Sequence, residues 1–393
     1  MNYDQYLNPR IASVPPSGIR RFFDLASTRK NAISLGVGEP DFKTPYMIRN
    51  AAINSLVDGE TQYTANRGLP ELRQEIGLYL KGRYQLSYDW NTQILVTIGA
   101  SEAIDLALRA LVSDGDEVLV PDPSYVSYAP GVVFAGGTPV PVTTYQKDDF
   151  RLTADSLEKA ITPRSKLLIL PYPNNPTGAI MEKHDLEQIA RVVEKHDLLV
   201  ISDEIYSELI YDGHVHVSFA ALEGMYPRTI TINGFSKAFA MTGWRVGYAC
   251  AAEEIIAVMN KIHQYAIMCA PTTSQYAAIE ALRSSDDDVS QMVEEYDRRR
   301  RIIVKGFNDI GLECREPFGA FYAFPSIKST GLTSEEFCEQ LLYSKKVAVV
   351  PGTAFGDSGE GFIRASYCYS LSHIKEALRR IKEFIDELEG AKK

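Results

Sequence analysis

Short apolar runs alternate with helix-like segments through the middle of this chain, and this alternation limits the fold more than any other feature of the sequence. After the apolar run at 94–98, further apolar residues recur at helical spacing at Ile104, Ala107, Leu108 and Leu111. Strands that alternate with helices favour βαβ units, so the sequence predicts an α/β fold with a mainly parallel sheet between helices. The predicted strands are 94–98, 118–120, 167–170, 198–201 and 229–232.

The two ends of the chain carry signals of a different kind and predict a smaller α+β domain. Thr44 followed by Pro45 predicts a helix start with an oxygen cap and a proline in the first turn. Thr333 and Glu336 fit a capping box, and 347–350 then predicts a strand. The last helix is expected from about residue 372, with an apolar stripe formed by Ile374, Ala377, Leu378, Ile381, Phe384 and Ile385.

Length and charge limit the number of domains and the classes of partner. A chain of 393 residues suggests about two domains. We predict an arm with part of the small domain at 1–45, a large domain at 46–285 and a small carboxyl-terminal domain at 286–393. The 41 Lys plus Arg against 51 Asp plus Glu give a net charge of −10. Because this charge repels phosphate backbones and anionic lipid, neither nucleic acid nor a membrane is expected as a partner.

The cysteines and histidines give no sign of a metal site or a disulfide framework. The five cysteines lie far apart without a Cys-x-x-Cys pair, and no metal-ligand spacing stands out among the six histidines. The first ten residues lack a secretion pattern, and no apolar run approaches the roughly 18 residues needed to cross a bilayer. We therefore expect reduced thiols and a cytoplasmic protein.

In an open parallel sheet, ligands bind beyond the carboxyl ends of the strands, so the residues after each predicted strand matter most. Gly99-Ala100-Ser101-Glu102 opens a helix, whose amides and dipole favour an anion. Taken alone, a tight turn is the simpler interpretation of this segment. The loop 171–178 carries Asn174 and Asn175, whose neutral side chains suit a ring oxygen or a carboxylate.

Two later strands are followed by ionisable residues. A buried acid such as Asp203 needs a cation, although a surface ion pair or helix cap explains this residue equally well. Tyr206 shares the face of Asp203 if the segment is helical. Lys237 lies among aromatic residues, where desolvation would lower its pKa and free a nucleophilic amine, although most lysines are solvated surface charges. Arg245, flanked by glycines, suits a phosphate.

Two further glycine motifs are incomplete. Gly36-Val37-Gly38 lacks the third glycine and the following helix of a dinucleotide fingerprint. Gly234-Phe235-Ser236 lacks the second glycine of a hydrolase nucleophile elbow. The sequence therefore favours neither NAD nor a serine hydrolase.

Taken in order, these residues resemble the class I aminotransferases, which are fold-type-I pyridoxal phosphate enzymes. Segments 38–42 and 238–245 are most similar to the branch of bacterial and archaeal aspartate or aromatic aminotransferases. The resemblance implies ping-pong transfer of an amino group from an L-amino acid, aromatic, aspartate or of broad range, to a 2-oxo acid such as 2-oxoglutarate. It rests on Tyr63, Pro173-Asn174-Asn175-Pro176-Thr177-Gly178, Asp203, Tyr206, Ser236, Lys237, Arg245 and Arg364.

The resemblance also implies a role for each residue around the cofactor ring. Lys237 would form the internal Schiff base and then move a proton between the substrate Cα and C4′ of the cofactor. Asp203 would keep the pyridine nitrogen protonated, which makes the ring an electron sink. Asn175 and Tyr206 would hydrogen-bond the phenolic oxygen, and Tyr125 would stack on the ring.

The same resemblance implies how the phosphate is held. The phosphate would meet the amides of Ala100 and Ser101, the hydroxyl of Ser236, and Arg245. Tyr63 would reach the phosphate of the neighbouring subunit. The resemblance therefore implies a homodimer whose active sites are shared between subunits.

The substrate site combines an expected anchor with two departures from the family. Arg364 would bind the α-carboxylate with help from Asn175 and the backbone of Gly38, whereas alone it fits an ordinary surface ion pair. Relatives specialised for aspartate carry lysines where this chain has Ser101 and Pro15. An aromatic or broad amino donor therefore fits at least as well as aspartate.

Two other functions stay open at this point. A carbon–sulfur β-lyase shares the same cofactor, lysine and aspartate with a transaminase. A non-catalytic regulator that senses pyridoxal phosphate would carry a DNA-binding segment, and no basic helix-turn-helix pattern precedes Gly36.

Overall fold

The predicted alternation of strands and helices forms one seven-stranded sheet. In the computed structural model, which describes residues 1, 3–19 and 31–391, the strand order is β2-β8-β7-β6-β5-β3-β4. Neighbouring strands run parallel except that β8 is antiparallel to both β2 and β7. The strands are β2 (Ile94–Thr97), β3 (Glu117–Asp122), β4 (Thr138–Thr143), β5 (Ser165–Leu170), β6 (Leu199–Asp203), β7 (Thr229–Gly234) and β8 (Gly247–Cys250).

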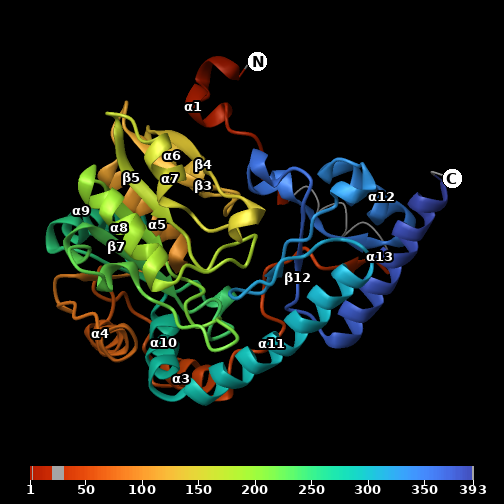
Figure 1. Ribbon diagram of the computed structural model, residues 1–393. Helices are drawn as coiled ribbons and strands as arrows, with labels where there is room; N and C mark the ends of the chain where they lie inside the picture. The colour runs from red at the N-terminus through yellow and green to blue at the C-terminus, as the bar shows by residue number, and fades with distance from the viewer. Residues whose placement is uncertain (2, 20–30, 392–393) are drawn as a thin grey trace.

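Helices cover this sheet on both faces, as Figure 1 shows. Successive residues of β5 point to opposite faces: Leu167 packs in one buried cluster with Ile104, and Leu168 in another with Leu186. The predicted α/β class is confirmed. The α-helices of this part of the molecule are α3 (Tyr46–Val57), α4 (Pro70–Tyr84), α5 (Gly99–Leu111), α6 (Tyr128–Ala135), α7 (Ala154–Ala160), α8 (Lys183–Lys195), α9 (Glu253–Ala266) and α10 (Thr272–Ser284).

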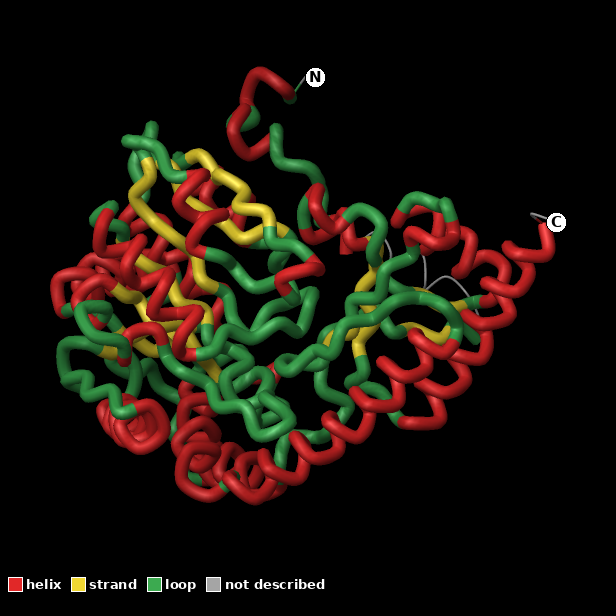
Figure 2. Tube along the Cα trace, in the orientation of Figure 1, coloured by secondary structure: helices red, strands yellow, loops and turns green. Residues whose placement is uncertain are grey.

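Two small sheets lie beside the carboxyl-terminal helices, apart from the seven-stranded sheet (Figure 2). One pairs β1 with β10 in parallel, and the other has the antiparallel order β11-β12-β9. The domain boundaries given above stay a prediction. The elements of this part are β1 (Ile33–Ser34), β9 (Tyr322–Ala323), β10 (Val347–Ala348), β11 (Val350–Pro351), β12 (Ile363–Ser366), α11 (Asp286–Asp309), α12 (Ser334–Lys345) and α13 (Leu371–Ala391).

The amino-terminal segments contact both parts of the molecule. The short helix α1 (Pro9–Ala12) contacts α6, and Arg10 Nη2 donates to Asp114 Oδ1, in the loop between α5 and β3, at 2.9 Å. Further along, β1 pairs with β10 beside the carboxyl-terminal helices. The residues before α3 therefore contact a helix beside the large sheet as well as one of the small sheets.

One predicted helix cap is wrong, and the predicted capping box is confirmed. Helix α3 begins at Tyr46 with Pro45 as its N-cap and no side-chain cap. The hydroxyl of Thr44 instead donates to Ala240 O at 2.6 Å and accepts from Trp244 Nε1 at 3.0 Å, because Thr44 is buried against that loop. Helix α12 has the reciprocal capping box between Thr333 and Glu336.

The strand predicted at 347–350 is also wrong as a single element. Val347 and Ala348 pair with β1, whereas Val350 and Pro351 pair with β12 in a different sheet. The chain changes partner at Val349, which is buried. An apolar run marks burial but does not tell which neighbour each residue pairs with.

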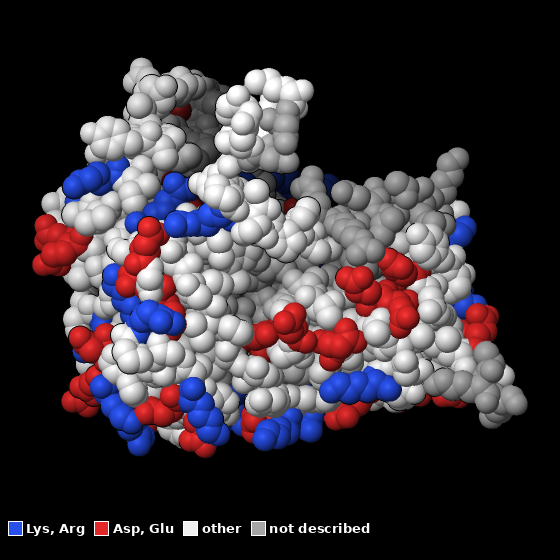
Figure 3. Space-filling view, turned by 90° about the horizontal axis from the view of Figure 1, so that it is seen from above, with Lys and Arg blue, Asp and Glu red and all other residues white. Residues whose placement is uncertain are grey.

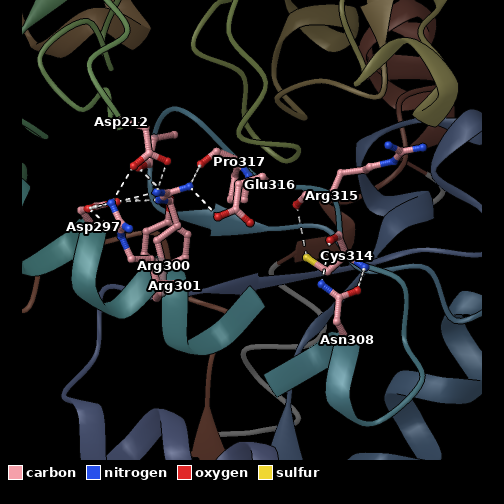
Figure 4. Close-up of polar contacts among 11 residues, drawn as sticks. Asp212, Asp297, Arg300, Arg301, Asn308, Cys314, Arg315, Glu316 and Pro317 are labelled. Atoms are coloured by element: carbon pink, nitrogen blue, oxygen red, sulfur yellow. Dashed lines mark hydrogen bonds and ion pairs between the residues drawn. The ribbon is translucent and has the colours of Figure 1, made fainter. Parts of the chain in front are cut away.

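A buried arginine ties α11 to two loops, as Figure 4 shows. The fully buried side chain of Arg300 donates to Asp212 Oδ2 at 2.5 Å and to Glu316 Oε1 at 3.0 Å. Asp297, one turn earlier on the helix, lies 2.6 Å from the same guanidinium. Because a buried cation without partners is very costly, these three carboxylates fix how α11 packs against the loops.

The surface carries charges of both signs. On the face seen in Figure 3, Lys and Arg groups are interleaved with Asp and Glu groups over the described residues. Within the described residues, no helix combines the length and the apolar character that a membrane crossing requires.

Candidate active site

One cavity of about 600 Å³ lies at the carboxyl ends of β5, β6 and β7. Its position follows from the parallel sheet, because these strand ends meet at one edge. Two residues singled out from the sequence lie outside its lining: Tyr63, whose side chain is 81% exposed, and Asn174, whose Oδ1 accepts from the hydroxyl of Thr177. The cavity is lined by the others: Gly38, Ala100, Ser101, Tyr125, Asn175, Asp203, Tyr206, Ser236, Lys237, Arg245 and Arg364.

Lys237 follows β7, and its amine is turned into the cavity. Nζ donates to the carbonyl of Gly38 at 2.7 Å and lies 5.7 Å and 5.5 Å from the ring centres of Tyr206 and Phe321. The pKa of this amine is lowered to about 8, mainly by burial and in part by the nearby charge of Arg364. The direction of the pKa shift is the one expected from the sequence.

Asp203 ends β6 and presents a buried carboxylate to the same cavity. Its Oδ2 accepts from the hydroxyl of Tyr128 at 2.7 Å, and its Oδ1 accepts from the amide of Ile205 at 3.2 Å. Burial raises the pKa of Asp203 to about 6, and the two hydrogen bonds offset part of that rise. The segment that leads to Tyr206 is a turn rather than a helix, yet both side chains line the cavity.

The start of α5 forms a cradle that suits an anion. Gly99 has φ +76°, and a Cβ there would lie 2.5 Å from Arg245 Nη2. A Cβ on Gly247 would lie 2.6 Å from the amide nitrogen of Ala100, so two glycines keep this backbone open. Glu102 Oε2 accepts from the amide of Ile98 at 2.5 Å and fixes the first turn. Helix amides and a guanidinium together favour a phosphate.

Arg364 lies deep in the cavity wall on β12. Its guanidinium lies over the rings of Tyr322 and Phe355, 4.4 Å and 4.7 Å from their centres. Nη1 donates to Asn175 Oδ1 at 2.8 Å and Nη2 to Gly36 O at 2.5 Å. Among the residues that the structure describes, Nε has no hydrogen-bond partner. A buried fork with unused donors is suited to a carboxylate.

Sequence reasoning missed two tyrosines of the site. Tyr128 contacts Asp203, and the hydroxyl of Tyr322 lies 2.8 Å from that of Tyr206. A Cβ on Gly38 would lie 2.0 Å from Tyr322 Oη, which explains the glycine there. No local pattern reveals these contacts, because the partners lie 75 and 116 residues apart along the chain.

The donor set fits an organic cofactor with an anionic group better than a metal ion. Among the residues that the structure describes, no group of three or more His, Cys, Asp or Glu side chains is placed to hold a metal. The cavity instead combines an amine, a buried acid and an anion cradle. These groups match the aldehyde, the ring nitrogen and the phosphate of pyridoxal phosphate.

Comparison with known proteins agrees with a site for pyridoxal phosphate. The family model for aminotransferase class I and II matches residues 30–381. The chain is 49% identical to an aspartate aminotransferase of Pyrococcus abyssi and 46% identical to aromatic-amino-acid aminotransferase 2 of Thermococcus litoralis, each over 97% of this chain and 98% of the relative. The crystal structure of an aromatic aminotransferase from Pyrococcus horikoshii matches with a TM-score of 0.90 and 48% identity, over 93% of this chain and 99% of that one.

Proposed function

This chain belongs to the class I and II aminotransferases, and from this premise we propose which of its residues carry the reaction and which substrates it takes. It is a transaminase that uses pyridoxal phosphate and acts on amino acids and 2-oxo acids. When bound, the cofactor supplies an aldehyde for the amino group and a ring that accepts electrons.

Lys237 is the residue that holds the cofactor and moves the proton, and Asp203 is the partner of the ring nitrogen. The observation that carries this proposal is that both side chains line one cavity while burial shifts their pKa values in opposite directions. Burial favours the neutral amine of Lys237, which can attack an aldehyde or take a proton from the substrate Cα. A cationic partner stabilises the ionised form of the buried carboxylate of Asp203.

Asn175 and Tyr206 would hydrogen-bond the phenolic oxygen of the cofactor, and Tyr125 would stack on its ring. The cradle at the start of α5, with Ala100, Ser101, Ser236 and Arg245, would hold its phosphate. The cradle described above and the open backbone at Gly99 and Gly247 support this assignment.

The reaction class can be tested by adding one amino acid without any 2-oxo acid. A transaminase releases one 2-oxo acid per site and then stops, because no second 2-oxo acid is present to accept the amino group that the cofactor now carries. A carbon–sulfur lyase continues to release pyruvate and ammonia. Product measured in a stoichiometry of one per site supports the proposal, and continued release of ammonia contradicts it.

The amino donor is an aromatic or a broad range of amino acids rather than aspartate alone. A neighbouring cavity of about 580 Å³ shares Ser101 and Tyr125 with the first and is also lined by Pro15. The charged residues among its described lining are the acids Asp105 and Glu335. Neither Ser101 nor Pro15 supplies the cation that a second carboxylate needs. Half-reaction rates across single amino acids test this, and a preference confined to aspartate would contradict it.

Replacing Arg364 by lysine is expected to raise the KM for the amino donor about 10- to 100-fold, because a charge-assisted hydrogen bond contributes about 1.5–3 kcal/mol. Lysine keeps the charge but loses the planar fork that a carboxylate fits. Steady-state kinetics with varied donor measure the change. Arg379→Lys, on the exposed side of α13, is the matched control and should leave KM unchanged. An unchanged KM in the Arg364 variant would remove this residue from the substrate site.

The rate at which the cofactor-free protein captures pyridoxal phosphate is expected to rise with pH and to level off near pH 8. The neutral amine of Lys237 is the nucleophile, and its pKa of about 8 means that its fraction grows about tenfold per pH unit below that value. Stopped-flow absorbance of the lysine-bound cofactor measures the rate. A rate that still climbs steeply between pH 9 and 10 would mean that the amine titrates like an exposed lysine.

The active enzyme is a homodimer in which Tyr63 reaches the phosphate of the neighbouring subunit. The 81% exposure of Tyr63 and a row of exposed apolar side chains on α3 support this assembly. Sedimentation at working concentration tests it, and a fully active monomer would contradict it. The row consists of Tyr46, Met47, Ile53, Leu56 and Val57.

A further inference from the structure

We propose that Tyr128 is a positioning residue for Asp203: its hydroxyl holds the carboxylate in the orientation and the charge state that the cofactor's ring nitrogen requires. The inference rests on the proposed role of Asp203. It adds a residue from α6 to a reaction otherwise assigned to residues at the strand ends.

The geometry of the contact gives the hydroxyl a defined direction. An ionised carboxylate only accepts hydrogen bonds, so the hydroxyl of Tyr128 is the donor in its 2.7 Å contact with Asp203 Oδ2. The amide of Ile205 donates to the other oxygen at 3.2 Å. With a donor on each oxygen, the carboxylate plane is held at both ends. Asp203 and Tyr128 both line the cavity, and each carboxylate oxygen keeps a lone pair for a further donor.

Tyr128 is itself held rigidly and stays a donor. It is the first residue of α6, is 3% exposed, and meets the ring of Tyr125 edge-on, with centres 5.5 Å apart and planes at 79°. Burial and the charge of Asp203 raise the pKa of its hydroxyl well above the usual value, so it does not ionise. The ring needs no hydroxyl for this packing. A buried hydroxyl that donates to one carboxylate therefore indicates that its role is this hydrogen bond.

The hydroxyl controls where a shared proton lies. A proton between the carboxylate of Asp203 and the ring nitrogen goes to the group with the higher proton affinity. Hydrogen bonding to the ionised carboxylate lowers the proton affinity of Asp203 and leaves the proton on the nitrogen. Without the hydroxyl of Tyr128, the proton moves towards the carboxylate, and the neutral ring accepts electrons less well.

Tyr128→Phe tests the inference because it removes the hydroxyl and keeps the ring. The matched control is Tyr88→Phe, which also removes a buried hydroxyl, one that contacts Thr231 Oγ1 at 3.1 Å away from the cavity. Each protein is loaded with pyridoxal phosphate carrying ¹⁵N in its ring, and the nitrogen resonance is measured by solid-state NMR. Donor half-reactions are followed on the same samples.

In Tyr128→Phe the nitrogen resonance is expected to move towards the unprotonated position. The half-reaction rate should fall about 10- to 100-fold, while the KM for the donor stays within about twofold because Arg364 is untouched. Tyr88→Phe should match the wild type in both measurements. A wild-type resonance and rate in Tyr128→Phe would overturn the inference and leave the hydroxyl with a packing role.

Two further variants separate the possible failures. Asp203→Asn should shift the resonance to the unprotonated position. If it does not, the proposed role of Asp203 fails, and the inference on Tyr128 fails with it. If Asp203→Asn shifts the resonance and Tyr128→Phe does not, only the inference fails. Should Tyr128→Phe not fold, p-aminophenylalanine at this position keeps a weaker donor, and its resonance should move the same way by less; an unmoved resonance overturns the inference.

Discussion

Replacing Lys237 by alanine is expected to abolish turnover and the absorbance of the lysine-bound cofactor while leaving a folded protein. The variant loses both the amine that attacks the aldehyde and the base that moves the proton, so the rate should fall at least about 10⁴-fold. The side chain is half-buried, and among the described residues its hydrogen-bond partner is Gly38 O. Its removal therefore affects little of the core. Absorbance spectra and steady-state rates measure the loss.

Two comparisons make the Lys237 result specific. Lys166→Ala removes a lysine whose ion pair with Asp116 lies at the surface, and it should keep both the absorbance and the rate. Unfolding by circular dichroism should give similar midpoints for the two variants. Normal turnover in Lys237→Ala would end the assignment of this residue, whatever the spectra show.

The sequence predicted five of the seven strands of the large sheet, because their signals are local, and it missed β4 and β8. Each of the strands β5, β6 and β7 is a short apolar run, and each is followed directly by the residues that line the cavity. Parallel strands bring their carboxyl ends to one edge, so Asn175, Asp203 and Lys237 meet although they are far apart in the chain. Order along the sequence was therefore enough to predict that these three line one cavity.

The contacts that the sequence left out depend on tertiary packing. Tyr128 and Tyr322 come from a helix start and a short strand, and nothing next to them in sequence marks Asp203 or Tyr206 as their partners. Thr44 has the sequence of a helix cap, yet its hydroxyl is used by the loop at Ala240. In each case the side chain hydrogen-bonds a group that is distant in the sequence, and the local pattern does not reveal this partner.

Burial has opposite consequences for the two central ionisable groups of the site. It disfavours charge on both, which lowers the pKa of Lys237 to about 8 and raises that of Asp203 to about 6. Near neutral pH, the carboxylate is therefore a buried anion that gains from a cationic partner, and the amine is ready to lose its proton. Groups whose environments shift their pKa values apart are a frequent mark of acid–base sites.

Replacing Asp203 by alanine is expected to lower the half-reaction rate about 10²- to 10³-fold while some cofactor still binds. The ring nitrogen then has no anionic partner and loses its proton, whereas the phosphate cradle at Gly99 and Arg245 is unchanged. Single-turnover absorbance measures the rate. Asp116→Ala, which removes a surface carboxylate, is the control.

Loading the Asp203→Ala variant with a cofactor methylated on the ring nitrogen tests whether the carboxylate acts through the charge of that nitrogen. Such a ring is permanently cationic and needs no carboxylate to keep a proton, so it should restore a large part of the lost rate. The same cofactor should give the wild type no gain. If the alanine variant reacts at the wild-type rate with the ordinary cofactor, Asp203 has no part in the electron sink. If the methylated ring restores nothing, the carboxylate acts by some means other than the charge of the nitrogen.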